Sequence, residues 1–341
     1  MALAVILAGC SVIDDDLSGC GESAEIDYDL TLVTNITTEI ETQLETELNT
    51  ELEMELAAEL RGHLGDIFTD HAHDVDLSFY DTQGDSLRLQ HDEHIMDANQ
   101  ASYTLNLPKR EYMHLATANV VDNQLVDLVN DERCHQAVLY QERSDTIDSH
   151  TTGLFTARQD IEILEGIDQN FSVHLYMANC SAALVIDTQG HDVSKMQVYS
   201  TGFASGFLVC DSAYVYAERP PIVRTTRIAK TDDSNEVAFC SVTFPSREPA
   251  QTRTIIETTE PFITPYSDEA LWELRVYVPS EGTRQEPTYT ETKLFIREPL
   301  RAGQLKIVKF RVTENGVIVP ENPEVSTSVT LDWKEGLDID G

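Results

Sequence analysis

Two clusters of histidine and carboxylate side chains have the residue types that bind divalent metal ions. The first cluster consists of His71, His73, Asp66, Asp70, Asp74 and Asp76. The second is the run His91-Asp92-Glu93-His94. Imidazole nitrogens and carboxylate oxygens at such short spacing are known zinc ligands. However, the chain holds 60 Asp and Glu among 341 residues, so acids surround most histidines by chance. We therefore predict no metal site and no cofactor.

Motifs for catalysis are missing from the sequence. We find no Gly-x-Ser-x-Gly nucleophile elbow, no His-Glu-x-x-His zinc motif, no phosphate loop and no dinucleotide fingerprint. We predict that the protein is not an enzyme and has no catalytic residues. An exported hydrolase stays open as an alternative, because a carboxylate pair for sugar hydrolysis leaves no local motif.

Cys10 has a sequence context suited to covalent lipid attachment. The apolar residues 2–8 end in the small residues of Leu7-Ala8-Gly9, as in a secretory signal and its cleavage site. Leu7-Ala8-Gly9-Cys10 resembles the lipobox of bacterial lipoproteins, in which the signal is cut before the cysteine and the cysteine is acylated. The sequence departs from a typical signal because no Lys or Arg precedes the apolar run. We predict a signal peptide at residues 1–9 and a lipid on Cys10.

The net charge excludes two classes of partner. The 23 Lys and Arg and the 60 Asp and Glu give a formal net charge of −37. A chain with this charge is repelled by the phosphates of nucleic acids and by an anionic membrane surface. Beyond Cys10 no apolar stretch approaches the length of a transmembrane helix. Attachment to a lipid bilayer is therefore predicted to depend on acylated Cys10.

Six cysteines, without a Cys-x-x-Cys motif, are typical of an exported protein. We predict a disulfide between Cys210 and Cys240, which belong to neighbouring predicted strands. A second pair, Cys20 with Cys134, would fix the start of the chain to the first domain. Cys180 lies in an apolar strand pattern and is predicted to be a buried free thiol.

The strongest local pattern predicts one long helix at residues 38–64. Thr38-Glu39-Ile40-Glu41 is a capping box, and leucines follow at every fourth position up to Leu64. Four residues turn about 400°, so this apolar row drifts around the helix by about 40° per step. A parallel row of glutamates places like charges four residues apart, and these charges repel one another: Glu47, Glu51, Glu55 and Glu59. The helix therefore needs a sheet or a partner to pack against.

The rest of the sequence predicts short β-strands. Residues 25–33 alternate between apolar and polar, and residues 171–186 form a long apolar pattern that could pass from one domain into the next. Strands at this spacing favour β-sandwich domains. We expect an acidic tether at residues 10–24, a first domain at 25–168 that contains the helix, and a second at 169–341.

Several segments, in order along the chain, are similar to the fimbrillin-A-associated anchor proteins. They are Cys-Ser-Val-Ile-Asp-Asp-Asp-Leu-Ser-Gly-Cys at 10–20, Ile-Phe-Thr-Asp at 67–70, Val-Asp-Leu-Ser-Phe-Tyr at 75–80, Gly-Leu-Phe-Thr-Ala-Arg at 153–158, Val-His-Leu-Tyr-Met-Ala-Asn-Cys at 173–180 and Val-Thr-Phe-Pro-Ser at 242–246. The resemblance implies two transthyretin-like β-sandwich domains on a lipoprotein of the outer membrane. It also implies the base subunit that anchors a pilus, with a pilin of the stalk as partner. The acidic run Asp14-Asp15-Asp16 resembles the signal that exports lipoproteins to the cell surface in the phylum with such pili.

The joint with the stalk is predicted to be strand addition in the second domain. The last predicted strand, residues 325–333, either completes its own sheet or exchanges into a partner. The alternative function is a surface lipoprotein that binds glycan or host protein, for which exposed aromatic side chains on one sheet would be evidence.

Overall fold

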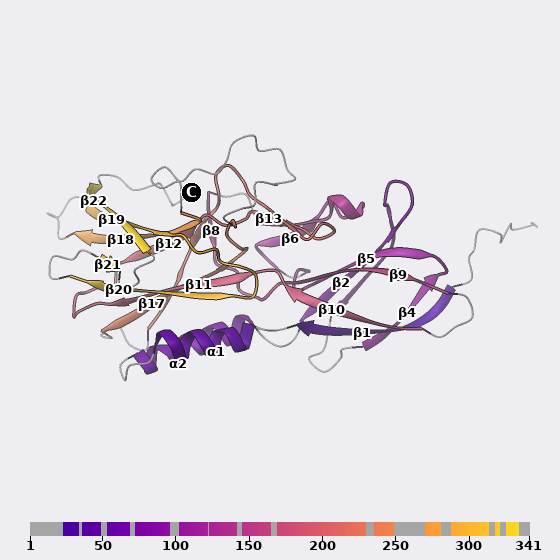
Figure 1. Cartoon of the computed structure of the whole chain (residues 1–341), viewed down its shortest axis with the longest axis horizontal. Coiled ribbons are helices and arrows are strands. Elements are labelled where there is room, and N and C mark those ends of the chain that lie inside the picture. The colour runs from indigo at the N-terminus through magenta and orange to yellow at the C-terminus, as the bar shows by residue number, and fades with distance from the viewer. Residues whose placement is uncertain are drawn as a thin grey trace, which may run out of the picture.

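The computed structural model describes residues 23–33, 36–48, 53–68, 72–95, 102–121, 123–141, 145–164, 169–229, 235–248, 270–280, 288–313, 318–320 and 325–333. Within these ranges the fold is mainly β, as predicted, and consists of four sheets with a pair of α-helices on one side (Figure 1). Cys10 and Cys20 lie outside the described residues, as do Asp70 and His71 of the first histidine cluster.

A seven-stranded sheet folds over to make the first sandwich. Its order is β3-β2-β5-β9-β10-β1-β4. The strands are β1 (Ser23–Val33), β2 (Asp74–Asp81), β3 (Arg88–Ile95), β4 (Ser102–Pro108), β5 (Glu111–Ala118), β9 (Phe155–Glu162) and β10 (Gln169–Met177). β9 and β10 pair only at Tyr176↔Thr156 and Met177↔Phe155, so the two halves of the sheet separate beyond this corner. The two halves enclose a single hydrophobic core, which contains Leu77 from one half and Val173 from the other.

Two further sheets face each other in the second sandwich. One has the order β16-β17-β11-β20-β21 and the other the order β22-β19-β18-β12-β15-β8. Their strands are β8 (Thr146–Asp148), β11 (Cys180–Asp187), β12 (Gln197–Thr201), β15 (Ile222–Arg224), β16 (Thr226–Ile228), β17 (Glu236–Thr243), β18 (Trp272–Ser280), β19 (Thr288–Ile296), β20 (Leu305–Val312), β21 (Ile318–Pro320) and β22 (Val325–Trp333). The core between them surrounds Trp272, which is fully buried. The fold therefore contains two sandwiches, whereas a transthyretin-like strand arrangement stays a prediction.

β11 is buried on both faces, which explains its nearly continuous apolar sequence. Leu184 and Ile186 point into the core of the second sandwich. Ala183 and Val185, on the opposite face because side chains alternate along a strand, pack against the helices. A strand that is covered on both sides lacks the alternating polar positions that mark a half-exposed strand.

The predicted single helix is wrong, because the segment forms two helices that fold back on each other. They are α1 (Ile36–Glu47) and α2 (Glu53–Ile67). The Arg61 guanidinium donates to both carboxylate oxygens of Glu41, at 2.7 Å and 3.0 Å. In one straight helix those residues would be about 30 Å apart at 1.5 Å per residue.

The drift of the leucine row gives the physical reason for this hairpin. Over the six steps from Ile40 to Leu64, at about 40° each, the row would turn by about 240° around one helix, so one sheet could not cover it. As two helices, both halves of the row reach the same surface: Leu44, Leu60 and Leu64 are buried against the β16-β17-β11-β20-β21 sheet. Lys309 of β20 adds an ion pair to buried Glu53 at 2.5 Å. The helices thus pack on the second sandwich, and their placement in the first domain was also wrong.

A small fourth sheet lies between the two sandwiches, in the order β14-β13-β7-β6. Its strands are β6 (Val126–Val129), β7 (Val138–Gln141), β13 (Gly206–Leu208) and β14 (Ala213–Val215), and the 3-10 helix η2 (Cys134–Gln136) connects β6 to β7. Its core includes Tyr80 and Leu115 of the first sandwich and Phe244, which follows β17 of the second. The small sheet therefore contacts both larger units.

The division of domains at residues 168 and 169 stays a prediction. β10 begins at Gln169 but pairs with β1 in the first sandwich over eight residue pairs, from Ile26↔Gln169 to Val33↔Tyr176. β8, from the first half of the chain, pairs with β15 of the second sandwich. The chain passes from the first sandwich to the second between β10 and β11, but α1, α2 and β8, which come earlier in the sequence, also pack with the second sandwich.

Candidate functional site

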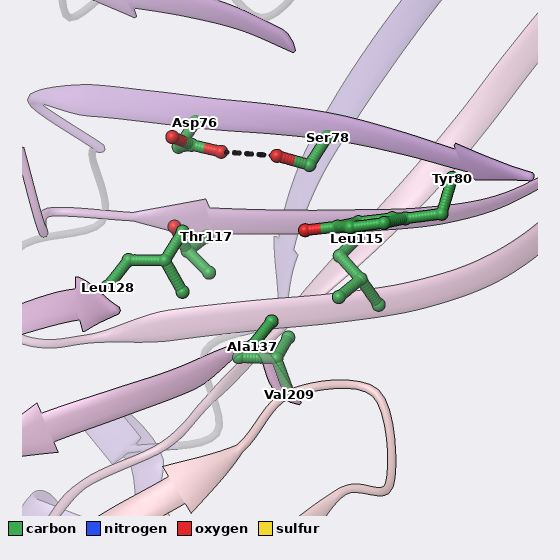
Figure 2. Close-up of a pocket in the computed structure, with 8 residues that line it drawn as sticks. All are labelled: Asp76, Ser78, Tyr80, Leu115, Thr117, Leu128, Ala137 and Val209. Atoms are coloured by element: carbon green, nitrogen blue, oxygen red, sulfur yellow. Dashed lines mark hydrogen bonds between the residues drawn. The ribbon is translucent and has the colours of Figure 1, made fainter. Parts of the chain in front are cut away.

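A small hollow lies at the seam between the first sandwich and the small sheet (Figure 2). It is lined by Asp76, Ser78, Tyr80, Leu115, Thr117, Leu128, Ala137 and Val209. The empty volume is about 170 Å³, but the walls leave no room for a water molecule. Ser78 donates to a carboxylate oxygen of Asp76 at 3.1 Å, and the Tyr80 hydroxyl donates to the carbonyl of Asp131 at 2.7 Å. The hollow is a packing seam and cannot admit a substrate.

Asp76 connects this seam to the second predicted histidine cluster. β2 and β3 place Asp76 opposite Glu93 and Ser78 opposite His91. The Nε2 of His91 lies 2.5 Å from a carboxylate oxygen of Asp76 and 3.7 Å from one of Glu93. Burial raises the pKa of the Asp76 carboxyl, and the hydrogen bond with His91 opposes that rise. One ligand atom from each residue could reach a common metal ion.

The predicted clusters come together only in part. Asp76 reaches His91 and Glu93 across the strand pair, although the sequence assigned them to separate clusters. The backbone N–H of His73, just before β2, donates to the Asn119 side chain at 2.7 Å. The absence of a metal site stays a prediction.

Two histidines that sequence reasoning did not single out are fully enclosed. Burial lowers the pKa of both His114 and His150 to about 4. His114 stacks on Phe79, with ring centroids 4.4 Å apart, and its Nδ1 contacts the Ser78 carbonyl at 3.0 Å. Nε2 of His150 lies 3.1 Å from the side-chain oxygen of Gln141. Both are neutral core residues at physiological pH and are bonded to amide or carbonyl groups rather than to a nucleophile.

The structure places Cys210 and Cys240 in different cores, whereas Cys20 of the other predicted pair lies outside the described residues. Cys210 lies beside Cys134, with the two Sγ atoms 2.7 Å apart. Cys240 points toward the helices, in a different core, and contacts the Ser181 hydroxyl at 3.3 Å. The contacts therefore disfavour the pair Cys210–Cys240 and leave Cys134 next to a partner other than Cys20. Cys180 is a buried thiol that donates to the Thr243 carbonyl at 3.4 Å.

Open sheet edges are the remaining candidate for function. In the second sandwich, the described edge strands β8, β16 and β21 have three residues each, whereas edge strand β22 has nine. β22 pairs with β19 from Ile296↔Val325 to Tyr289↔Trp333, so its other side is unpaired within the described sheet. β22 lies at one end of the long axis, and the β1 and β4 strands of the first sandwich lie toward the other (Figure 1).

No helix in the part of the chain that the structure describes is both long and apolar enough to span a membrane. Within the described residues, the candidate features are a closed seam, a pair of buried thiols and open sheet edges.

Comparison with known protein families shows the family to which the chain belongs. Residues 23–258 match the family model of the fimbrillin-A associated anchor proteins Mfa1 and Mfa2. The chain belongs to this family. The resemblance expected from the sequence is thereby confirmed over most of the chain, from β1 to beyond β17. No curated protein matches the chain.

Several solved structures are similar to this chain at low sequence identity. A proposed polysaccharide-binding protein from Bacteroides thetaiotaomicron is 10% identical, with 89% of this chain and 97% of that chain covered and a TM-score of 0.50. A proposed adhesin from Bacteroides ovatus is 10% identical, with 93% and 97% covered and a TM-score of 0.50. The fimbrial anchor protein Mfa2 from Porphyromonas gingivalis is 9% identical, with 91% and 100% covered and a TM-score of 0.45.

Proposed function

We propose that this protein is the anchor subunit of a fimbria, held in the outer membrane by acyl chains on Cys10 and joined to the stalk by strand addition at β22. Membership of the anchor family carries the proposal. The family is named for anchoring rather than for a reaction, in keeping with a structural protein.

The arrangement of the chain supports two separate attachment points. A subunit at the base of a fimbria needs a tether at one end and a joint at the other. β1, the first strand after the tether, belongs to the first sandwich, whereas β22 lies at the far end of the second (Figure 1). Tension between membrane and stalk would then run along the molecule.

The β22 edge is suited to the joint because of its length. An edge strand presents unpaired N–H and C=O groups, and an extended partner segment can satisfy them. Nine residues offer several main-chain hydrogen bonds, whereas the three-residue edges offer one or two. The strongly negative chain discourages self-association, which leaves the edge to a different partner.

The described residues expose little aromatic surface of the kind that the adhesin alternative needs. Of the large hydrophobic side chains that are exposed in the described residues, one is aromatic, Tyr176. Trp272, one of two tryptophans in the sequence, is fully buried. The hydrolase alternative needs a pocket beside a carboxylate of raised pKa, and the hollow beside Asp76 has no room for substrate.

The proposal is tested with prolines on β22 and a deletion of residues 326–341. Neighbouring strand residues direct their N–H groups to opposite sides of the strand. Of the two substitutions Thr327→Pro and Ser328→Pro, one therefore removes a backbone hydrogen bond to β19. The other removes only an N–H group that faces outward at the open edge. The variants are compared by thermal unfolding and by co-purification with the stalk subunit.

We expect the outer-edge proline to keep the unfolding temperature of the native protein while capture of the stalk subunit falls at least tenfold. The deletion should also abolish capture. A matched proline on β4, Thr104→Pro, lies on an edge of the other sandwich and should leave capture intact. If folded β22 variants capture the stalk as well as the native protein does, strand addition at β22 is wrong.

A further inference from the structure

We propose that Cys134 and Cys210 form a disulfide that fastens the small sheet between the two sandwiches. Cys134 opens the η2 turn between β6 and β7, and Cys210 follows β13. Both are buried thiols in this structure, with their Sγ atoms 2.7 Å apart. A bond between them would join two segments 76 residues apart in the chain.

The backbone around the two cysteines is already held in place by hydrogen bonds. β13 pairs with β7 from Gly206↔Tyr140 to Leu208↔Val138. The N–H of Val209, next to Cys210, donates to the carbonyl of Ala137 at 3.1 Å. A disulfide requires Cα atoms within a narrow range of separations, and this pairing keeps the two segments adjacent.

The surroundings of Cys210 favour it as the attacking group. A hydrogen bond from Cys134 lowers the pKa of the Cys210 thiol to about 7, and the charge of His135 acts in the same direction while burial opposes both. Nδ1 of His135 lies 3.4 Å from the Cys210 sulfur. The same hydrogen bond raises the pKa of Cys134, which therefore acts second.

Bond formation is a balanced thiol–disulfide exchange with a disulfide donor of the oxidising compartment. The Cys210 thiolate attacks one donor sulfur, forms a mixed disulfide and releases one donor thiolate. Cys134 then loses its proton, attacks the Cys210 sulfur and expels the second donor thiolate. Two protein thiols are oxidised and one donor disulfide is reduced to two thiols. Because both cysteines are about 1% exposed in the folded protein, the donor reaches Cys210 through a local opening of the small sheet.

A metal ion is the rival occupant, since His135, Cys210 and Asp211 could each supply one ligand. With zinc–sulfur bonds of about 2.3 Å, two thiolates in a tetrahedral site lie roughly 3.8 Å apart. The sulfurs of Cys134 and Cys210 are much closer than that. The separation favours a direct bond over a shared ion.

The test is mass spectrometry of the full chain, purified from the cell envelope with free thiols alkylated at lysis. We expect a peptide that links Cys134 to Cys210 and disappears on reduction, while Cys180 and Cys240 carry the alkyl label. A bridge from Cys210 to Cys240 or from Cys134 to Cys20 would overturn the proposal. So would alkylation of both residues, or stoichiometric zinc whose removal exposes them.

Thermal unfolding gives a second, independent readout. Reduction of the native protein should lower the unfolding temperature by about 5–10 °C, and Cys134→Ser, Cys210→Ser and the double variant should lose a similar amount. In these variants reductant should have no further effect. Cys180→Ser serves as the control, because it should keep the native response to reductant. An equal response to reductant in the native protein and the double variant would contradict the bond.

Discussion

Gly202→Ala should lower the free energy of unfolding by about 3–5 kcal/mol, from backbone strain plus overpacking. Gly202 has φ +103, a conformation that residues with a Cβ rarely adopt. A Cβ there would lie 2.7 Å from Cα of Trp272 and 2.9 Å from the carbonyl oxygen of Leu271. Both are backbone atoms, at the start of the strand that carries the central tryptophan, so neither can rotate away. Denaturant unfolding of the purified protein measures the loss.

Gly303→Ala is the matched control for this prediction. Gly303 also has a positive φ, +71, but a Cβ added at this position would meet no other atom within 4 Å. This substitution should lower the free energy of unfolding by only about 1 kcal/mol, the cost of placing a residue with a Cβ in this backbone conformation. If the two substitutions destabilise the protein equally, the close packing of β12 and β18 around Trp272 does not determine the stability of the second sandwich.

Cys10→Ala should move nearly all of the protein from the membrane fraction to the soluble fraction. Each buried CH₂ of an acyl chain contributes about 0.8 kcal/mol to membrane binding, so the loss of several chains removes the attachment. The described helices supply no alternative span. Fractionation of cells that carry the variant measures the effect, and an unchanged unfolding temperature shows that the fold is intact.

Cys20→Ala is the control for lipid attachment. It removes a cysteine from the same part of the chain but leaves Leu7-Ala8-Gly9-Cys10 unchanged. This variant should remain in the membrane fraction. Retention of Cys10→Ala in the membrane pellet would show that something other than the acyl chains holds the protein there.

Strand periodicity could be predicted from the sequence because it depends on local alternation. Residues 171–186 read as one long strand that passes between domains. In the structure β10 and β11 divide this stretch at Ala178 and Asn179, and the two strands belong to different sandwiches. The buried Asn179 amide donates to the Thr152 carbonyl at 2.9 Å, a contact from elsewhere in the chain that a local pattern does not reveal.

The helical hairpin could not be predicted from local signals. Residues 48–52, Leu-Asn-Thr-Glu-Leu, contain neither Gly nor Pro, the usual marks of a break. The break follows from tertiary packing, because only a folded pair brings Leu44 and Leu60 to the same sheet. The drift of the leucine row was the available sign that a single straight helix would leave apolar residues uncovered.

Contacts between distant side chains were the least predictable part of the candidate site. Spacing cannot decide which of six cysteines are neighbours, since they allow 15 complete pairings. Cys134 and Cys210 meet because β7 and β13 pair in the small sheet, which was not predicted. Asp76 and His91 likewise meet through the β2–β3 register.

Amide hydrogen exchange of the protein with and without its stalk subunit tests strand addition most directly. An added strand forms hydrogen bonds with the outward N–H groups of β22, so the account predicts slower exchange at alternate residues of Val325–Trp333 in the complex. Exchange in β4, on an edge of the other sandwich, should not change. A stable complex that leaves exchange in β22 unchanged, or protects β4 instead, would contradict the proposed joint.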